Sequence, residues 1–185
     1  MIALGIFILP KVEDRVLGAE QDNVVRQLNH QFKKGADTVN VTDESLGKAV
    51  AILEIPKIEL VVPIYYGTDD AILSKAVGVV EGTSDIDGGK GKNSVLSAHR
   101  GLSQKKLFTN LPKLELKDRF TLASETGKRV YQVDKISEIK AEELQDTPEK
   151  YLAKSPDKDY ITLMTCTPLY INTHRLLVRA HRVYD

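Results

Sequence analysis

From residue 48 to its C-terminus, the chain alternates short apolar, β-branched runs with polar, turn-forming segments. Such runs predict short β-strands, and many short strands separated by turns are typical of a mainly β sandwich or barrel. Brief helices are predicted in the longer gaps, and no internal repeat is evident. We expect strands at 49–55, 58–64, 93–99, 118–123, 129–138, 159–166 and 174–183, and helices at 69–76, 105–111 and 141–144.

The N-terminal part has a different pattern. Apolar residues recur at helical spacing between residues 11 and 34, and Lys33, Lys34 and Gly35 supply a basic last turn and a glycine stop. We therefore predict an amphipathic helix over 11–34. Its apolar stripe either packs against the β-rich part or lies near a membrane, and packing is the more common arrangement. The stripe consists of Val12, Val16, Val24, Val25, Leu28 and Phe32.

Two segments flank this helix. Residues 1–10 are apolar, but the stretch is too short to cross a bilayer by itself, because a spanning helix needs about 20 residues. A buried terminal strand or helix is one explanation for it. Residues 36–47 are polar and rich in turn formers, which predicts a linker. The predicted division is an N-terminal segment over 1–47 and a β-rich domain over 48–185.

Composition restricts the class of function. The 185 residues are 42% hydrophobic and carry 26 basic and 26 acidic side chains. These values fit one globular domain with an appendage, and the lack of a basic surplus argues against nucleic-acid binding. The single cysteine excludes an intramolecular disulfide. Glu81, Asp85 and Asp87 could attract a divalent cation, but a solvated acidic loop is the favoured interpretation, so no metal site is predicted.

The single cysteine, Cys166, stands at the end of the predicted strand 159–166, and two other groups have the chemistry to work with it. A free thiol has a pKa of about 8.5, so a nucleophilic cysteine needs a neighbour that lowers this value or accepts the proton. His99 could do either, and could later protonate a leaving amine. Arg175 keeps its charge and offers donors in a fixed fork, which suits an oxyanion or a substrate backbone. Together they predict an acyl-transfer enzyme.

Each candidate also has a structural alternative. A single cysteine is often only a small buried hydrophobe, and Arg175 could be a surface charge. Ser97 and Thr165, beside the catalytic candidates, could bind substrate backbone, although strand hydroxyls usually bond to local groups. His174 should point away from the face that carries Arg175, because successive residues of a strand alternate. Arg179 shares that face but lies four residues further along the strand.

The sequence around these residues resembles that of the sortases, the cysteine transpeptidases of Gram-positive bacterial surfaces. Residues 162–166 match the Thr-Leu-x-Thr-Cys signature of that family, and residues 99–101 match its His-Arg-Gly context. Arg175 matches the arginine on the strand that follows the cysteine. The similarity extends over roughly residues 48–183. Within the family, residues 173–179 look most like the pilin-polymerising group called class C.

This resemblance implies a closed eight-stranded barrel with Cys166 as nucleophile, His99 as acid and base, and Arg175 as the oxyanion-stabilising group. It implies cleavage of LPXTG-like sorting signals between Thr and Gly through a thioester, without a cofactor. The partners implied are pilins or surface proteins that carry such signals. The acceptor would be an amine, either a pilin lysine in pilus assembly or a cell-wall precursor in a housekeeping enzyme, with hydrolysis as a side activity. A cell-surface location is also implied, with residues 1–10 as the remnant of an N-terminal membrane anchor.

One feature departs from class C. No proline lies between Pro10 and Pro56, so the Asp-Pro-aromatic lid motif of that group is absent. Three explanations stay open: a variant without a lid, a cover formed by residues 36–47 through other contacts, or a different subclass. A non-catalytic surface barrel that binds pilins and merely buries its thiol is the alternative from another class of function.

Overall fold

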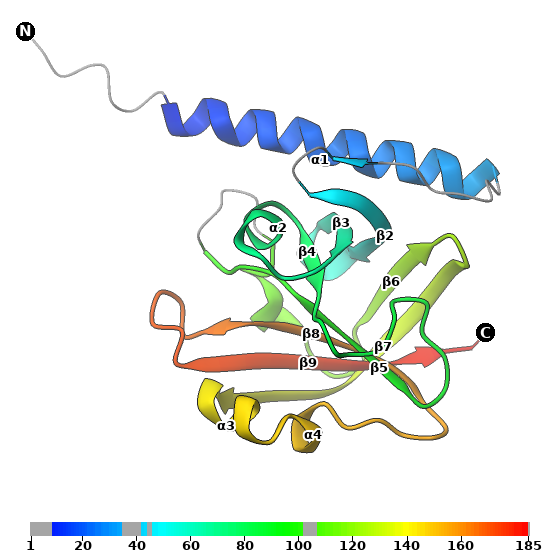
Figure 1. Ribbon diagram of the computed structural model, residues 1–185, viewed down its shortest axis with the longest axis vertical. Coiled ribbons are helices and arrows are strands. Elements are labelled where there is room, and N and C mark those ends of the chain that lie inside the picture. Colours follow the sequence, from blue (N-terminus) through cyan, green and yellow to red (C-terminus); the bar gives the residue numbers. More distant parts are fainter. Residues whose placement is uncertain (1–8, 35–41, 44–45, 102–106, 185) are drawn as a thin grey trace, which may run out of the picture.

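The structure is a computed structural model that describes residues 9–34, 42–43, 46–101 and 107–184. Eight strands form a closed barrel in the order β2-β3-β4-β5-β8-β9-β7-β6, and pairing of β6 with β2 completes the circle (Figure 1). This confirms the closed eight-stranded barrel. The strands are β2 (Gly47–Ile55), β3 (Leu60–Tyr66), β4 (Val77–Val79), β5 (Lys92–Ser97), β6 (Arg119–Ser124), β7 (Gly127–Lys140), β8 (Asp159–Thr167) and β9 (His174–Val183). A two-residue strand, β1 (Thr42–Asp43), pairs with the start of β2.

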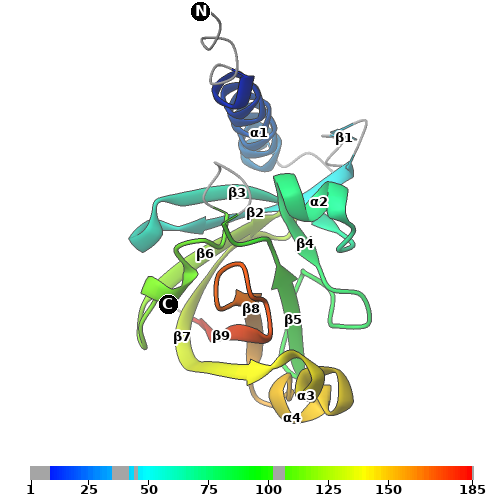
Figure 2. The same ribbon diagram turned by 90° about the vertical axis from the view of Figure 1, so that its left-hand side faces the viewer.

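Three adjacent strands, β5, β8 and β9, carry or lead to the candidate site residues. β5 and β8 run parallel, and the chain between them crosses the barrel through β6 and β7. β8 and β9 run antiparallel and are joined by a short loop, and β9 pairs on its other side with β7. Viewed at 90° to Figure 1, the loop between β8 and β9 projects at one end of the barrel (Figure 2).

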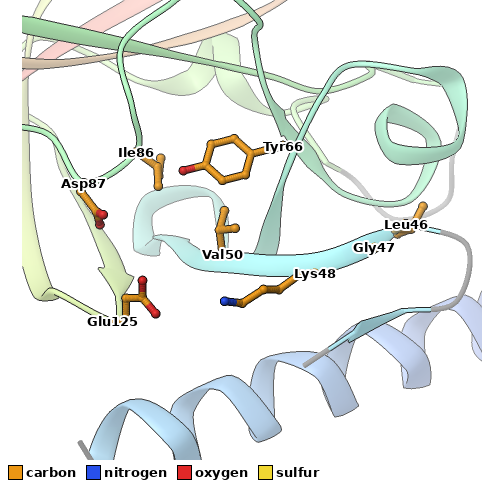
Figure 3. A pocket seen from close by; sticks show the side chains of 8 residues that line it. All are labelled: Leu46, Gly47, Lys48, Val50, Tyr66, Ile86, Asp87 and Glu125. Carbon is orange, nitrogen blue, oxygen red and sulfur yellow. The ribbon is translucent and has the colours of Figure 1, made fainter. Parts of the chain in front are cut away.

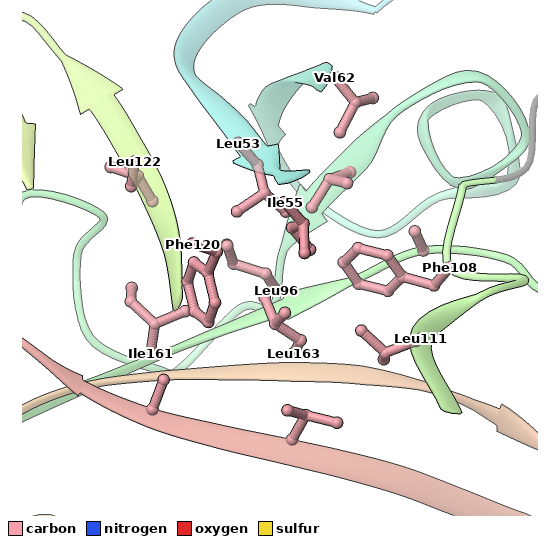
Figure 4. Packing of buried hydrophobic residues seen from close by; sticks show 14 of the residues in the cluster. Leu53, Ile55, Val62, Leu96, Phe108, Leu111, Phe120, Leu122, Ile161 and Leu163 are labelled. Carbon is pink, nitrogen blue, oxygen red and sulfur yellow. The ribbon is translucent and has the colours of Figure 1, made fainter. Parts of the chain in front are cut away.

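The barrel interior is filled by one cluster of buried apolar side chains, contributed alternately by the strands (Figure 4). Phe120 stacks on Tyr131 with 5.7 Å between ring centroids. Phe108 and Leu111, from the connection between β5 and β6, are completely buried in the same cluster. Burial of this apolar surface is the main favourable term for the fold.

Helix α1 (Leu9–Lys34) lies across β2 and β3 on the outside of the barrel (Figures 1 and 2). Leu28 is fully buried against Ile52 and Tyr65, and Val24, Val25 and Phe32 pack around this second cluster. The predicted packing of the apolar stripe is thus confirmed for these positions. The side chains of Val12 and Val16 lie outside the described residues, as do residues 1–8. None of the helices in the described part combines the length and the apolar character needed to cross a bilayer.

Short helices fill several of the connections. Helix α2 (Asp70–Lys75) begins where the Asp69 side chain accepts a hydrogen bond from the Ile72 N–H, and α3 (Ala141–Asp146) follows β7. Both confirm predicted helices. The helix predicted over 105–111 is wrong in its described part, where a turn leads into the 3-10 helix η2 (Leu111–Lys113). Pro112 accounts for this, because the residue before a proline avoids the α conformation.

Besides β1 and η2, three short elements are absent from the prediction. They are β4, the 3-10 helix η1 (Pro56–Ile58) and helix α4 (Pro148–Tyr151). Because η1 ends at Glu59, whose φ is +53°, β3 begins at Leu60 rather than at the predicted residue 58. The predicted linker over 36–47 falls largely outside the described residues, and its described part includes β1.

Candidate active site

Cys166 and His99 lie at the same end of two adjacent strands. The last pair in the parallel ladder between β5 and β8 joins Ser97 to Met164. His99 and Cys166 each follow two residues later on their own segments. Residues two apart in an extended chain point to the same face of a sheet. The side chains of His99 and Cys166 therefore lie on the same face as the paired residues Ser97 and Met164, at neighbouring positions.

This face is the outer surface of the barrel. Leu96, Ala98 and Leu163 belong to the interior cluster, so the residues that alternate with them point outward. β8 is buried on both faces from Asp159 to Leu163, and then Met164 and Cys166 become partly exposed. The thiol is therefore presented at the end of the strand where the outer face opens to solvent.

Arg175 lies directly opposite Cys166 in the antiparallel pairing of β8 with β9. Opposed residues in such a pair have Cβ atoms about 4.5–5.5 Å apart and share a face. The Arg175 Nη1 atom donates to the carbonyl oxygens of Asn172, at 2.9 Å, and of His174, at 3.1 Å. No bond from its Nη2 or Nε atom to a described residue competes with a substrate. The guanidinium is thus anchored and still has donors to offer.

The main chain around His99 is held from several sides. Its N–H donates to the Leu73 carbonyl of α2 at 3.4 Å, and its carbonyl accepts from the Phe108 N–H at 3.2 Å. The preceding residue, Ala98, donates its N–H to the Met164 carbonyl at 3.4 Å. These bonds fix the segment that carries the imidazole relative to both α2 and β8.

The two predicted substrate-binding residues have different environments. Thr165 is buried, and its Oγ1 donates to the Ala98 carbonyl at 2.8 Å, so its hydroxyl links the segment that carries His99 to the segment that carries Cys166. Ser97 is partly exposed on the outer face that also carries Cys166. Substrate contact by either residue stays a prediction, and the geometry favours Ser97 because its face is the one that a substrate would meet.

Two basic residues near the site have other partners. His174 pairs with Thr167 and therefore faces away from Cys166, as the alternation predicts. Arg179 donates from Nε to Asp134 Oδ1 at 2.8 Å, and its guanidinium lies over the Tyr160 ring, 4.3 Å from the ring centroid. These contacts give Arg179 a structural function.

Two further contacts join the segment after His99 to the segment after Cys166, and neither involves a residue predicted for the site. The Arg100 Nη1 atom donates to Thr167 Oγ1 at 3.1 Å. Gly101 approaches Leu169 so closely that a Cβ atom on Gly101 would lie 2.3 Å from Leu169 Cδ1. No local pattern in the sequence identifies Arg100, because its partner Thr167 lies 67 positions away.

The loop that joins β8 to β9 begins with a cis peptide bond between Thr167 and Pro168. Beyond Leu169, its tip exposes 74% of Tyr170 and 66% of Ile171. They lie on the connection between the strands that carry Cys166 and Arg175.

A hollow of about 390 Å³ lies elsewhere, between the start of β2, the end of β3 and the turn between β6 and β7 (Figure 3). Val50, Ile86 and Tyr66 form part of its wall, and Lys48 and Glu125 also line it. None of the predicted site residues lines this hollow. Concavity alone therefore does not locate the chemistry in this molecule.

The acidic loop beside that hollow is tied to the barrel by hydrogen bonds. The Tyr66 hydroxyl donates to Asp85 Oδ1 at 2.6 Å, which holds the pKa of the Asp85 carboxyl below its usual value. Burial and the same bond raise the pKa of Tyr66. Ser124 and Thr126 donate to Asp87 Oδ1 at 3.2 and 3.0 Å. Among the residues that the structure describes, no three His, Cys, Asp or Glu side chains are grouped as metal ligands.

Comparison with known proteins agrees with this geometry. The sortase domain family matches residues 53–183. Sortase D of Bacillus subtilis is 30% identical over 145 residues, covering 74% of this chain and 68% of that protein. A lid mutant of sortase A from Corynebacterium diphtheriae has a TM-score of 0.69 at 32% identity, covering 91% of this chain and 96% of that one.

A pilus-related sortase C of group B Streptococcus is similar to the same degree. It has a TM-score of 0.68 at 32% identity, covering 88% of this chain and 89% of that one. The family match includes His99, Cys166 and Arg175. The chain therefore belongs to the sortase family.

Proposed function

We propose that this protein is a cell-surface cysteine transpeptidase that cleaves LPXTG-like sorting signals between Thr and Gly and transfers the acyl group to an amine. The observation that carries the proposal is the placement of Cys166 opposite Arg175, with His99 at the matching position beyond the adjacent strand. Membership of the sortase family gives these three positions a shared chemistry. Partial exposure of Cys166 supports access by a peptide.

In the acylation step, His99 takes the proton of the Cys166 thiol as the sulfur attacks the threonine carbonyl carbon. The free donors of Arg175 stabilise the resulting oxyanion. The carbon–nitrogen bond to glycine then breaks, and His99 returns the proton to the leaving amine. The product of this step is a thioester between Cys166 and the threonine carbonyl.

In the second step, a neutral acceptor amine attacks the thioester carbonyl. His99 removes a proton from the amine, the carbon–sulfur bond breaks, and Cys166 leaves and is reprotonated. The new bond is an amide. We propose a pilin lysine as the acceptor, which gives an isopeptide-linked polymer, because a pilus-related sortase C is among the similar structures. The equal likeness to a sortase A keeps a cell-wall precursor amine as the second candidate.

The test of this function is formation of an acyl-enzyme, followed by mass spectrometry of the intact protein with an LPXTG peptide. Cys166→Ala should form no adduct, and an adduct that persists in this variant would exclude Cys166 as the nucleophile. His99→Ala should also abolish turnover. The matched control is His174→Ala, which should keep most activity because His174 faces away from the site.

Arg175 can be tested in the same assay. Arg175→Lys keeps the charge but loses the planar fork, so turnover should fall strongly. Arg179→Lys, on the same strand and bonded to Asp134, is the control and should retain turnover. Near-native activity of Arg175→Lys would show that a positive charge alone suffices.

Two further measurements separate the alternatives. Supplying one sorting peptide together with a pilin-type lysine and a wall-type amine shows which acceptor the acyl-enzyme prefers. A non-catalytic barrel that buries its thiol would resist alkylation at neutral pH, whereas a cysteine paired with histidine reacts readily.

A further inference from the structure

Main-chain pairing between β5 and β8 ends just before the catalytic residues. The last paired residues are Ser97 and Met164, and the Ala98 N–H makes one more bond to the Met164 carbonyl. Nothing in the regular ladder therefore fixes how far the His99 segment stands from Cys166. Beyond this point, side-chain hydrogen bonds connect the segment that carries His99 to the segment that carries Cys166.

Two such bonds bracket the catalytic pair. On the near side, Thr165 Oγ1 donates to the Ala98 carbonyl at 2.8 Å. On the far side, Arg100 Nη1 donates to Thr167 Oγ1 at 3.1 Å. Each bond joins the residue before or after His99 to the residue before or after Cys166. Because neighbours in an extended segment alternate, these linking side chains point away from the face that carries the chemistry.

The environment of Arg100 is unusual for a purely structural residue. Its Nε atom is buried and has no hydrogen-bond partner among the described residues. A buried donor without a partner lowers stability, and such groups in native proteins call for an explanation. An uncharged side chain of similar length would fill the same space without this penalty. The hydrogen bond from Arg100 to Thr167 is an interaction that such an uncharged side chain without a donor could not make.

We propose that Arg100 is a positioning residue that, through Thr167, holds the segment of the general acid–base His99 at its working distance from the nucleophile Cys166. The proposal rests on the proposed function, since it assigns a task within that same site. Arg100 touches neither substrate nor the reacting atoms in this view. It acts by extending the connection between β5 and β8 past the end of the ladder.

The experiment uses the full chain, four single variants and the double variant Arg100→Met/Thr167→Val. Arg100→Met removes the guanidinium, and Thr167→Val removes the hydroxyl while keeping the side-chain shape. Thr167→Ser keeps the hydroxyl. Arg119→Met is the matched control, because Arg119 is an exposed arginine at the start of β6. The readout is the first-order rate constant of the first acylation turnover with an LPXTG peptide, which does not depend on how much of the protein is folded.

We expect Arg100→Met and Thr167→Val each to lower the saturating rate constant by roughly 10- to 100-fold, because small misplacements of catalytic groups have effects of this size. The peptide concentration at half saturation should stay the same. Thr167→Ser should restore the rate, and Arg119→Met should match the wild type. The double variant should be no slower than the slower single variant, because both substitutions remove the same hydrogen bond between Arg100 and Thr167.

Several results would overturn the proposal. Effects that multiply in the double variant would show that the two residues act independently. A raised half-saturation concentration with an unchanged rate would make Arg100 a substrate contact instead. If Arg100→Met does not fold, equal rates for Thr167→Val and Thr167→Ser would reject the positioning function by themselves.

Failure of the proposed function would look different, since the wild type itself would form no acyl-enzyme. Alkylation of Cys166 by iodoacetamide then decides the inference without a substrate. A thiol held beside its histidine reacts faster than one that has lost this partner. Thr167→Val should therefore alkylate more slowly than Thr167→Ser, and equal rates would refute the positioning function.

Discussion

Gly101 provides a quantitative test of how tightly the segment after His99 packs against the segment after Cys166. Its φ is +83°, a left-handed conformation that costs an L-residue about 1–2 kcal/mol. Alanine also restricts the unfolded chain, which offsets about 0.4–1 kcal/mol. A Cβ atom would lie 2.3 Å from Leu169 Cδ1, so Leu169 must leave its rotamer at a further cost of about 0.5–1.5 kcal/mol. Gly101→Ala should therefore lower the free energy of unfolding by about 2 kcal/mol.

Urea unfolding of the full chain measures this loss, and a double-mutant cycle with Leu169→Ala separates its parts. Shortening Leu169 removes the collision but not the backbone cost, so the two substitutions should couple by about 1 kcal/mol. Gly82→Ala is the control, because Gly82 has a similar φ of +76° and no atom within 4 Å of the Cβ position. It should show no coupling to Leu169→Ala. A coupling below about 0.3 kcal/mol for Gly101 would refute the close packing of the two segments.

Three other substitutions test separate parts of the molecule. Thr165→Val leaves the buried Ala98 carbonyl without its donor and should lower the free energy of unfolding by about 1–3 kcal/mol in urea titrations; no change would mean that the bond contributes nothing. Leu28→Ala removes a fully buried side chain between α1 and the barrel and should cost about 2–5 kcal/mol, whereas a negligible cost would argue that α1 does not pack there in solution. Tyr66→Phe removes the hydrogen bond that lowers the pKa of Asp85. A carboxyl group with a lowered pKa stabilises the folded state above its unfolded-state pKa, and this contribution is lost as pH falls through its folded-state pKa. The variant should thus be less stable than wild type at neutral pH, by no more than about 1 kcal/mol because the pair is exposed, and equal to it in strong acid; a gap that persists there would reject the linkage.

The fold could be predicted from the sequence where strands are long and their composition is distinctive. The run that forms β8 was predicted to within one residue, because β-branched residues and a continuous apolar pattern mark a strand buried on both faces. β4 was missed because Val77, Gly78 and Val79 are too few to establish a period. The pairing of β4 with both β3 and β5 is a tertiary interaction, which the sequence of three residues does not indicate.

The same limit applies to the candidate site. Cys166, His99 and Arg175 could be selected by their chemistry, and strand alternation correctly separated His174 from them. Arg100 could not be selected in this way, because its partner Thr167 lies 67 positions away in the sequence. Only the parallel pairing of β5 with β8 brings the two together, and a crossover of that length leaves no local pattern to read.

Closure of the barrel through β2 and β6 has a consequence for how a sorting peptide can be held. Each of the eight barrel strands has a neighbour on both sides over at least part of its length, so the barrel has no edge strand with one side wholly free for a peptide to pair with. Under the proposed function, a peptide bound at Cys166 therefore lies over the outer face of the barrel and is recognised largely through its side chains. Under the proposed function, this closed arrangement favours recognition of a short side-chain motif over main-chain pairing with any extended polypeptide.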